Sequence, residues 1–250
     1  MLSLLEHLGR FTHFAFTALP AALLAWRKPG ELFRQLYLIW LGAIPLGFVA
    51  GLALGFVVWI HLHGVVDVTF RDKVPEFVAY AIVLEFAPLG AGLILAGRSG
   101  ASLGAELGSM KLSEQIDAIE VLGLSPMKQL VGPRVLACMV TLPLLAVIMT
   151  YVALGSSYFA EYLGGTMSWA TYWNAVERGL SGIGVAKIIL STLKTVVFGY
   201  LVAVTGCWFG MEATGGTEGV GAAATRGVVA SIFLVLIANV FLVKLIEMVS

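Results

Sequence analysis

Three polar residues lie in long apolar stretches, where an ionisable or amide side chain needs a specific partner. They are Glu85, Lys194 and Asn239, each in a different stretch. At a rise of 1.5 Å per helical residue, all three lie about 12–14 Å from one end of their stretches. An isolated charge at the centre of a membrane costs at least ~2.5–3.5 kcal/mol, so Glu85 and Lys194 are predicted to form an ion pair. That pair either lines a polar pathway or fixes the register of the helices, and the sequence leaves both interpretations open.

A second group of charges lies between the second and third apolar stretches, in the polar segment 98–134. Glu114, Asp117 and Glu120 follow one another at three-residue spacing, so a helix places all three along one face. A short helix with an acidic edge suits docking into a groove on another protein. The alternative is a solvated helix lying on the membrane surface, which the anionic lipids of a cytoplasmic leaflet disfavour.

The ends of this short helix are also predicted from residue types. Ser113 is expected as the N-cap and Gly123 as the first residue beyond the helix. Ile116 and Ile119 form a second, apolar face, with Leu122 beside them. The sequence therefore predicts a helix of two chemically different faces between two apolar stretches.

Residue types that support catalysis or metal binding are sparse. The motif G-x-x-x-x-G-K-[ST] is absent, so this chain is not expected to bind ATP through a P-loop. His61 and His63 have no carboxylate or cysteine beside them and are too few for a metal site. Cys138 and Cys207 lie in apolar runs and predict no disulfide framework. No catalytic residue, metal site or bound cofactor is therefore assigned to this chain.

The composition identifies the class of protein. Of 250 residues, 59% are hydrophobic and 12% are charged, against about 45–50% and about 25% in a soluble domain. So few charges cannot cover a water-facing surface of this size. Basic and acidic residues balance at 15 each, so the net charge indicates no partner. A soluble globular protein, a disordered chain and a nucleic-acid-binding protein are excluded.

Five apolar runs are long enough to cross a bilayer, which needs about 20 residues per helix. They predict an all-α integral membrane protein with five transmembrane helices, since no strand-type alternation is present. Nine Lys and Arg residues fall on one side of these runs and four on the other. The positive-inside rule places the N-terminus in the cytoplasm and the C-terminus outside. The runs are residues 36–62, 77–97, 135–160, 185–210 and 227–247.

Residues 1–35 precede the first run and are predicted to form helices at the cytoplasmic face. The run 11–26 has no charge but is short for a span, and the residues before it alternate polar and apolar faces at helical spacing. This pattern favours an amphipathic helix lying in the membrane interface. An additional or re-entrant span is the alternative.

Glycines recur at four-residue spacing in two places. Gly47, Gly51 and Gly55 form one stripe in the first run. A second stripe at the same spacing consists of Ala96, Gly100, Gly104 and Gly108. Small residues four apart allow two helices to approach closely in lipid. Either stripe packs within the chain or lies at an interface between subunits, and the spacing does not decide between them.

The segment between the second and third runs contains three motifs: Ala-Gly-Arg-Ser-Gly-Ala at 96–101, Ala-Glu-Leu-Gly-Ser-Met at 105–110, and Glu-Gln-Ile-Asp-Ala-Ile-Glu-Val-Leu-Gly at 114–123. In these motifs the chain resembles the MlaE/YrbE permease family. The glycine-rich block 215–229 is similar to the family's segment before its last span. The likeness extends over roughly residues 30–250, and its long central motif is specific.

The resemblance implies a permease subunit of an ABC transporter that moves phospholipids or related lipids. Implied partners are a second permease copy, a cytoplasmic ATPase dimer that binds ATP and Mg²⁺, an MCE-domain protein on the outer side, and membrane lipids. The implied location is the inner membrane of a bacterium. Residues 36–250 would form one permease domain, with 98–134 as its coupling segment. Docking on the ATPase would fall on Glu114, Gln115, Asp117, Ile119, Glu120 and Gly123.

The same resemblance implies a set of lipid-pathway residues. They are Leu54, Trp59, Leu62, Glu85, Lys194 and Asn239. Family members often carry a second carboxylate where this chain has Asn239, so this chain departs from the family there and lacks the second acid. The three residues of the first run are equally compatible with a lipid-facing or packing surface.

Two other classes of function compete with this interpretation. An ion-coupled secondary transporter would use Glu85 and Lys194, but such folds commonly contain an inverted repeat, and five spans do not divide into two matching halves. A membrane-embedded enzyme acting on lipids is the other class, and no motif supplies its nucleophile or metal.

Overall fold

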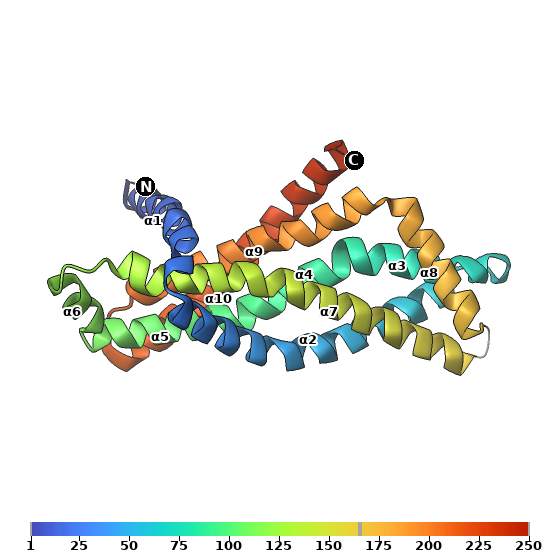
Figure 1. Cartoon of the computed structure of the whole chain (residues 1–250), viewed down its shortest axis with the longest axis horizontal. Helices are drawn as coiled ribbons and strands as arrows, with labels where there is room; N and C mark the ends of the chain where they lie inside the picture. The colour runs from blue at the N-terminus through green and yellow to red at the C-terminus, as the bar shows by residue number, and fades with distance from the viewer. Residues whose placement is uncertain (1, 165–166, 250) are drawn as a thin grey trace. The chain divides into compact units, whose positions relative to one another are not determined.

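The chain folds into helices joined by short turns. The computed structural model describes residues 2–164 and 167–249, and within them it contains no strand, so the prediction of an all-α protein is confirmed. Two 3₁₀ turns, η1 (Ala25–Arg27) and η2 (Val68–Lys73), and three π-helical turns, η3 (Ile82–Phe86), η4 (Ala96–Gly100) and η5 (Met127–Val131), join or interrupt the α-helices. The α-helices (Figure 1) are α1 (Leu2–Leu24), α2 (Pro29–Val65), α3 (Val74–Ala81), α4 (Ala87–Leu95), α5 (Ala101–Leu112), α6 (Gln115–Val121), α7 (Gly132–Gly164), α8 (Trp169–Ile183), α9 (Val185–Met211) and α10 (Gly216–Val249).

In the described part of the chain, five helical segments are long and apolar enough to cross a membrane, which confirms the five predicted spans. Helix α1 is not among them, in agreement with its assignment outside the set of spans. The interfacial position of α1 and the side on which each terminus lies stay predictions. The five segments are Pro29–Val65, Thr69–Leu112, Met127–Gly164, Val185–Met211 and Gly216–Met248.

The spans extend further than the apolar runs that predicted them. The second apolar run ends near Gly97, but the helix continues through η4 and α5 to Leu112. Most of the segment 98–134 is therefore helical rather than loop. The extension has a packing reason, because small residues along α5 contact α9 and α10.

The chain divides into two compact units, each assembled from three stretches of sequence. The first unit comprises Met1–Ala43, Gly92–Leu142 and Val196–Ala238, and the second comprises Ile44–Ala91, Pro143–Thr195 and Asn239–Ser250. Each unit thus joins residues from several of the spans. The predicted division into residues 1–35 and 36–250 separates helices at the cytoplasmic face from the permease domain. It is not a division into compact units, and it stays a prediction.

In the first unit, glycines of η4 and α5 lie against glycines of α9 and bring the helix backbones into contact. A Cβ atom at Gly206 would lie 3.0 Å from the carbonyl oxygen of Gly100, and one at Gly210 would lie 2.8 Å from that of Gly104. Gly104 also lies against the backbone of Ala224 in α10. These contacts assign the second glycine stripe to packing within the chain.

In the second unit, the other stripe lies along α2 and faces α7. A Cβ atom at Gly51 would lie 3.1 Å from the carbonyl oxygen of Met149, and one at Gly55 would overlap the carbonyl of Ala153. Gly47 meets the side chain of Leu145 in the same way. Both stripes therefore pack within one chain, and the alternative of a subunit interface is not needed to explain either.

The second unit also contains an aromatic and polar cluster where α7 and α8 pack together. Tyr172 is fully buried; its hydroxyl lies 2.6 Å from Ser157 Oγ and donates to the Leu154 carbonyl at 3.2 Å. Burial raises the pKa of Tyr172 to about 12, so the hydroxyl stays protonated at physiological pH. The cluster fixes the position of α8 on α7.

Candidate functional site

The predicted ion pair is present in the second unit. Lys194 is 3% exposed, and its Nζ lies 3.0 Å from both carboxylate oxygens of Glu85 and 2.8 Å from the carbonyl oxygen of Leu84. A lysine ammonium has three hydrogen-bond donors, and these three acceptors match them. The arrangement satisfies a buried charge, which is costly when left unpaired.

A π-helical turn positions the acceptors of this pair. Glu85 and Leu84 lie in η3, where the helix widens for one turn. The Leu84 carbonyl oxygen accepts from Ser191 Oγ at 2.5 Å as well as from Lys194, so two side chains of α9 meet one carbonyl of η3. Single π turns inside α-helices are frequent at functional sites. Here the turn joins the second span to the fourth by main-chain as well as side-chain contacts.

Asn239 completes the polar cluster from α10. Its Nδ2 donates to Glu85 Oε2 at 3.4 Å, and its Oδ1 is buried and has no hydrogen-bond partner among the residues whose side chains the structure describes. The structure therefore brings together the three polar residues that the sequence placed at one depth. The Asn239–Glu85 contact is long, so the shorter Glu85–Lys194 bond dominates the cluster.

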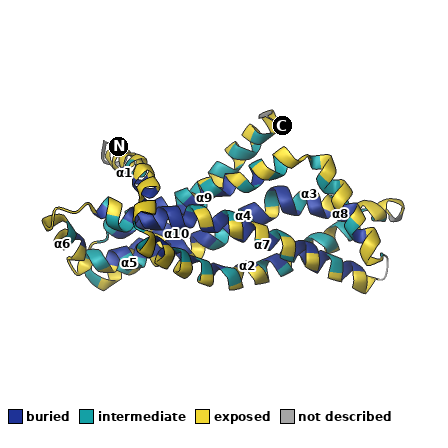
Figure 2. Cartoon of the chain, in the orientation of Figure 1, coloured by how far each residue is buried: buried dark blue, intermediate teal, exposed yellow. Residues whose placement is uncertain are grey.

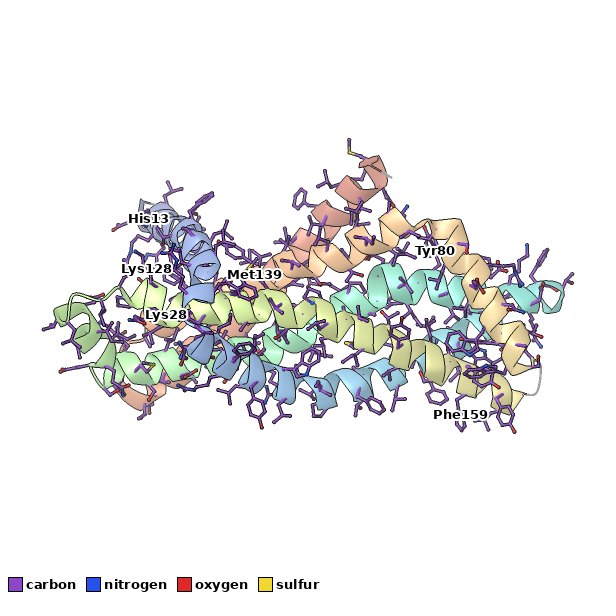
Figure 3. The ribbon with its side chains drawn as sticks, viewed as in Figure 1. His13, Lys28, Tyr80, Lys128, Met139 and Phe159 are labelled. Carbon is purple, nitrogen blue, oxygen red and sulfur yellow. The ribbon has the colours of Figure 1, made fainter. Side chains whose placement is uncertain are left out.

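A small cavity of about 130 Å³ lies beside the cluster. Glu85 faces it with a side chain that is 39% exposed, whereas Lys194 is sequestered. The carboxylate is therefore the member of the pair that a passing ligand can reach. The lining residues are Tyr80 (labelled in Figure 3), Leu84, Glu85, Lys187, Ser191, Val243, Ile246 and Glu247.

Sequence reasoning missed two participants in this cluster. Ser191 lies one turn before Lys194 on the same helix face, and that spacing was the available signal. Lys187, four residues before Ser191 on the same helix, contributes to the cavity lining. The role of the Leu84 carbonyl could not be predicted from the sequence, because every residue type has the same backbone acceptor.

The acidic helix α6 is present in the first unit, with different ends from those predicted. Ser113 is not its N-cap: it closes α5, and Glu114 precedes α6 in the left-handed region at φ 58°. Gly123 follows the helix at φ 73° as predicted, and its N–H donates to the Glu120 carbonyl oxygen at 2.9 Å. The N–H of the next residue, Leu124, reaches the Ile119 carbonyl oxygen at 3.1 Å, which completes a Schellman motif.

The faces of α6 differ in exposure as well as in charge. Most of α6 is exposed (Figure 2). Ile116 is buried and anchors the helix, whereas Val121 is 88% exposed and Leu122 is 73% exposed. Asp117 forms an ion pair with Lys111 of α5 at 2.6 Å, so it is not available as a free docking charge. The exposed surface therefore combines apolar tips with the remaining acids, Glu114 and Glu120, both of which are exposed.

The helix α5, which leads to α6, is tied to α7 by a buried charge. Arg134 is 2% exposed; it donates to Glu106 Oε1 at 2.8 Å and to the Leu130 carbonyl oxygen at 2.7 Å. Arg34 of α2 lies 3.9 Å from the same carboxylate oxygen. A displacement of α6 would therefore reach α7 through Glu106, which sequence reasoning left unassigned.

The model of the permease MlaE family matches residues 32–245, most of the chain. The chain belongs to the MlaE permease family. This MlaE permease is 30% identical over 231 residues to a probable ABC transporter permease protein of Rickettsia typhi, covering 92% of this chain and 88% of the relative. It is 32% identical over 155 residues to a probable ABC transporter permease protein of Synechocystis, covering 62% and 58%.

A plant relative of this MlaE permease is Protein Trigalactosyldiacylglycerol 1, chloroplastic, of Arabidopsis thaliana. The two chains are 34% identical over 154 residues, which cover 62% of this chain and 43% of the plant protein. Relatives named as ABC transporter permeases favour a transport subunit over an enzyme, and an ABC permease over an ion-coupled secondary transporter.

The residues that the MlaE resemblance singled out on the first span lie in α2, within the second unit. Leu54 packs near Gly90 of α4, where an added Cβ atom would lie 3.5 Å from Leu54 Cδ1. Leu62 is half-buried. Trp59 donates from Nε1 to Glu161 at 2.5 Å and stacks on His63 with ring centroids 4.6 Å apart. Trp59 thus takes part in a second polar cluster on α7 rather than in the cluster around Glu85.

Proposed function

We propose that this chain is the permease subunit of an ABC transporter that moves phospholipids or related lipids and is driven by a separate ATPase. Two copies form the permease in a bacterial inner membrane, and two ATPase subunits bind ATP and Mg²⁺ on the cytoplasmic side. An MCE-domain protein exchanges lipid on the outer side. Relatives named as ABC transporter permeases support the ATPase partner.

The observation that carries this proposal is the surface of α6. A free-standing helix of seven residues would be marginal in water, and here Ile116 and the Lys111–Asp117 ion pair hold it in place. Its outward side presents Val121 and Leu122 beside acidic residues. Exposed apolar side chains with a polar rim are typical of protein interaction sites. We assign ATPase docking to this side of α6.

The lipid cargo is supported by chemistry in the second unit and by one relative. The plant relative carries the name of a glycerolipid. The reachable Glu85 carboxylate, held by Lys194 and Asn239, offers a polar contact for a lipid headgroup. We place these three residues, with Leu54, Trp59 and Leu62, on the lipid pathway.

The first prediction concerns ATPase docking and is tested by co-purification. The protein is extracted from its native cells in mild detergent, and P-loop ATPases that elute with it are identified by mass spectrometry. We expect the double variant Glu114→Lys, Glu120→Lys to reduce the retained ATPase at least about tenfold, since it reverses the two exposed acids that lie outside the Lys111–Asp117 ion pair. Asp117 is left intact because its reversal would also break the ion pair with Lys111.

The matched control is Glu177→Lys, an exposed acidic residue of α8 in the second unit. We expect this variant to retain the ATPase and to insert in the membrane like the natural chain. A natural chain that brings down no P-loop ATPase would overturn the proposal as a whole. Full retention by the Glu114, Glu120 double variant would remove α6 from the docking surface.

A further inference from the structure

The first unit contains a cavity of about 720 Å³ that the proposed transport mechanism does not use. It lies between α1, the C-terminal part of α9 and the N-terminal half of α10, and we refer to it as the α1 cavity. Its volume falls in the range of about 300–1,000 Å³ that ligand sites occupy. Its lining residues are His7, Leu8, Phe11, Thr205, Trp208, Phe209, Glu212, Ala213, Thr214, Gly219, Ala222, Ala223, Arg226, Ala230, Phe233 and Leu234.

The walls of the α1 cavity are apolar and aromatic. Phe11 of α1 meets Trp208 of α9 edge-to-face, with ring centroids 5.9 Å apart, and this contact holds the two helices together. Phe233 and Leu234 extend the apolar wall along α10. A hydrocarbon chain is the ligand that such walls accommodate without leaving polar groups unpaired.

The lining contains one carboxylate, that of Glu212, and one guanidinium, that of Arg226. The Glu212 carboxylate is neutralised by Arg10, which also lies over the ring of Trp208 at 5.8 Å. Arg226 is exposed and forms no ion pair or side-chain hydrogen bond with any residue in 5–67, 69–164 or 167–248, whose side chains the structure describes. The guanidinium is therefore the group of this cavity that lacks an anionic partner.

The position of Arg226 in the sequence suits a phosphate group. It is the last charged residue of α10 before the long apolar part of the helix begins at Gly227. A cation at that boundary lies at the level of lipid headgroups, and an arginine fork matches phosphate oxygens in two-point contacts. Basic pockets between transmembrane helices bind anionic headgroups in this way.

We propose that the α1 cavity binds one anionic diacyl phospholipid, with its phosphate on Arg226 and an acyl chain against Phe11, Trp208 and Phe233. This lipid is a resident ligand, distinct from the lipid that passes Glu85 and Lys194. It would hold α1 against α9 and α10, because its chain contacts all three helices. The proposal requires only a membrane-embedded chain and not the assigned ATPase docking.

The test measures lipid binding by native mass spectrometry of the full chain, delipidated in detergent and titrated with phosphatidylglycerol or phosphatidylcholine. We expect one phosphatidylglycerol per chain to bind more tightly than phosphatidylcholine. Arg226→Gln should weaken phosphatidylglycerol binding about tenfold, the loss expected for a charge-assisted hydrogen bond. Glycerol 3-phosphate, which has the anionic group without the chains, should not compete at equal concentration.

Two matched controls separate the cavity from general surface effects. Arg27→Gln removes another exposed arginine that lines none of the described cavities, and it should leave binding unchanged. Ala230→Trp fills the α1 cavity and should abolish binding, whereas Val229→Trp, at a neighbouring residue that is 52% exposed and outside the lining, should not.

Three results would overturn the proposal. One is equal affinity of Arg226→Gln and the natural chain for phosphatidylglycerol. Another is competition by glycerol 3-phosphate, which would identify an anion site without a chain-binding part. The third is dissociation of a dimer by Ala230→Trp with lipid binding unchanged, measured by light scattering, which would assign the cavity to a second copy of the chain.

Discussion

At the scale of single residues, the most constrained group is the ammonium of Lys194. It is buried, and each of its three donors has an acceptor within 3.0 Å. Removing one partner of a buried pair leaves the other charge without compensation, whereas removing both partners is often tolerated. This difference separates a structural role of the pair from a role in transport.

We predict that Glu85→Gln lowers both stability and lipid transport. The loss of stability should be about 2 kcal/mol, below the ~3–5 kcal/mol for a fully buried pair, because Glu85 is 39% exposed. Thermal unfolding of the purified chain measures the first effect, and ATP-dependent lipid transfer in proteoliposomes with the partner subunits measures the second.

The control is the double variant Glu85→Gln, Lys194→Met, which removes both charges. It should recover most of the stability because no uncompensated charge remains, yet transport should stay impaired. Recovery of transport together with stability would assign the pair to helix register alone. The residues around it, such as Ser191, would then have no function beyond packing.

At the scale of helices, the first unit depends on close approach of α5 and α9. We predict that Gly210→Ala destabilises the chain by about 1–3 kcal/mol, because its new Cβ would lie 2.8 Å from the Gly104 carbonyl oxygen and force the helices apart. Gly221→Ala in α10, where a Cβ meets nothing within 4 Å, should be neutral or stabilising by about 0.5–1 kcal/mol. Thermal unfolding of both variants checks the contrast, and equal effects would contradict it.

The helices were largely predictable, because a bilayer requires apolar runs of a known length. All five spans and the stripe positions follow from such runs and from spacing. The extension of the second span to Leu112 was missed because a helix rich in small and polar residues gives no hydropathy signal. The π turn η3 was missed because a single widened turn has no signature in composition.

The candidate site was predictable in part for the same reasons. Depth along a span brought Glu85, Lys194 and Asn239 together, since helix rise converts sequence position into distance. The ion pair of Lys111 with Asp117 was not predictable, because it depends on the bend at Glu114, where a left-handed backbone turns α6 back toward α5. Because of that bend, Asp117 is paired with Lys111, and the acids left for docking are Glu114 and Glu120.

At the scale of the whole molecule, the distribution of basic residues predicts which regions face the cytoplasm. Ser113 and Ser181 are both exposed, lie outside the five spans, and belong to regions expected on opposite sides. An impermeant maleimide applied to intact spheroplasts should label Ser181→Cys, and Ser113→Cys only after permeabilisation. Background labelling should be low because Cys138 and Cys207 are buried. The reverse labelling pattern would invert the assigned topology.

One ligand of the Lys194 ammonium is a main-chain atom, the carbonyl oxygen of Leu84. No side-chain substitution at Leu84 deletes that atom, whereas the Glu85 carboxylate and the lysine itself are each removed by a single codon change. A complete mutational survey of this permease would therefore detect the two charged residues and pass over the third component of their site. The same limit applies to comparisons among relatives, in which Leu84 is free to vary while its oxygen keeps its role.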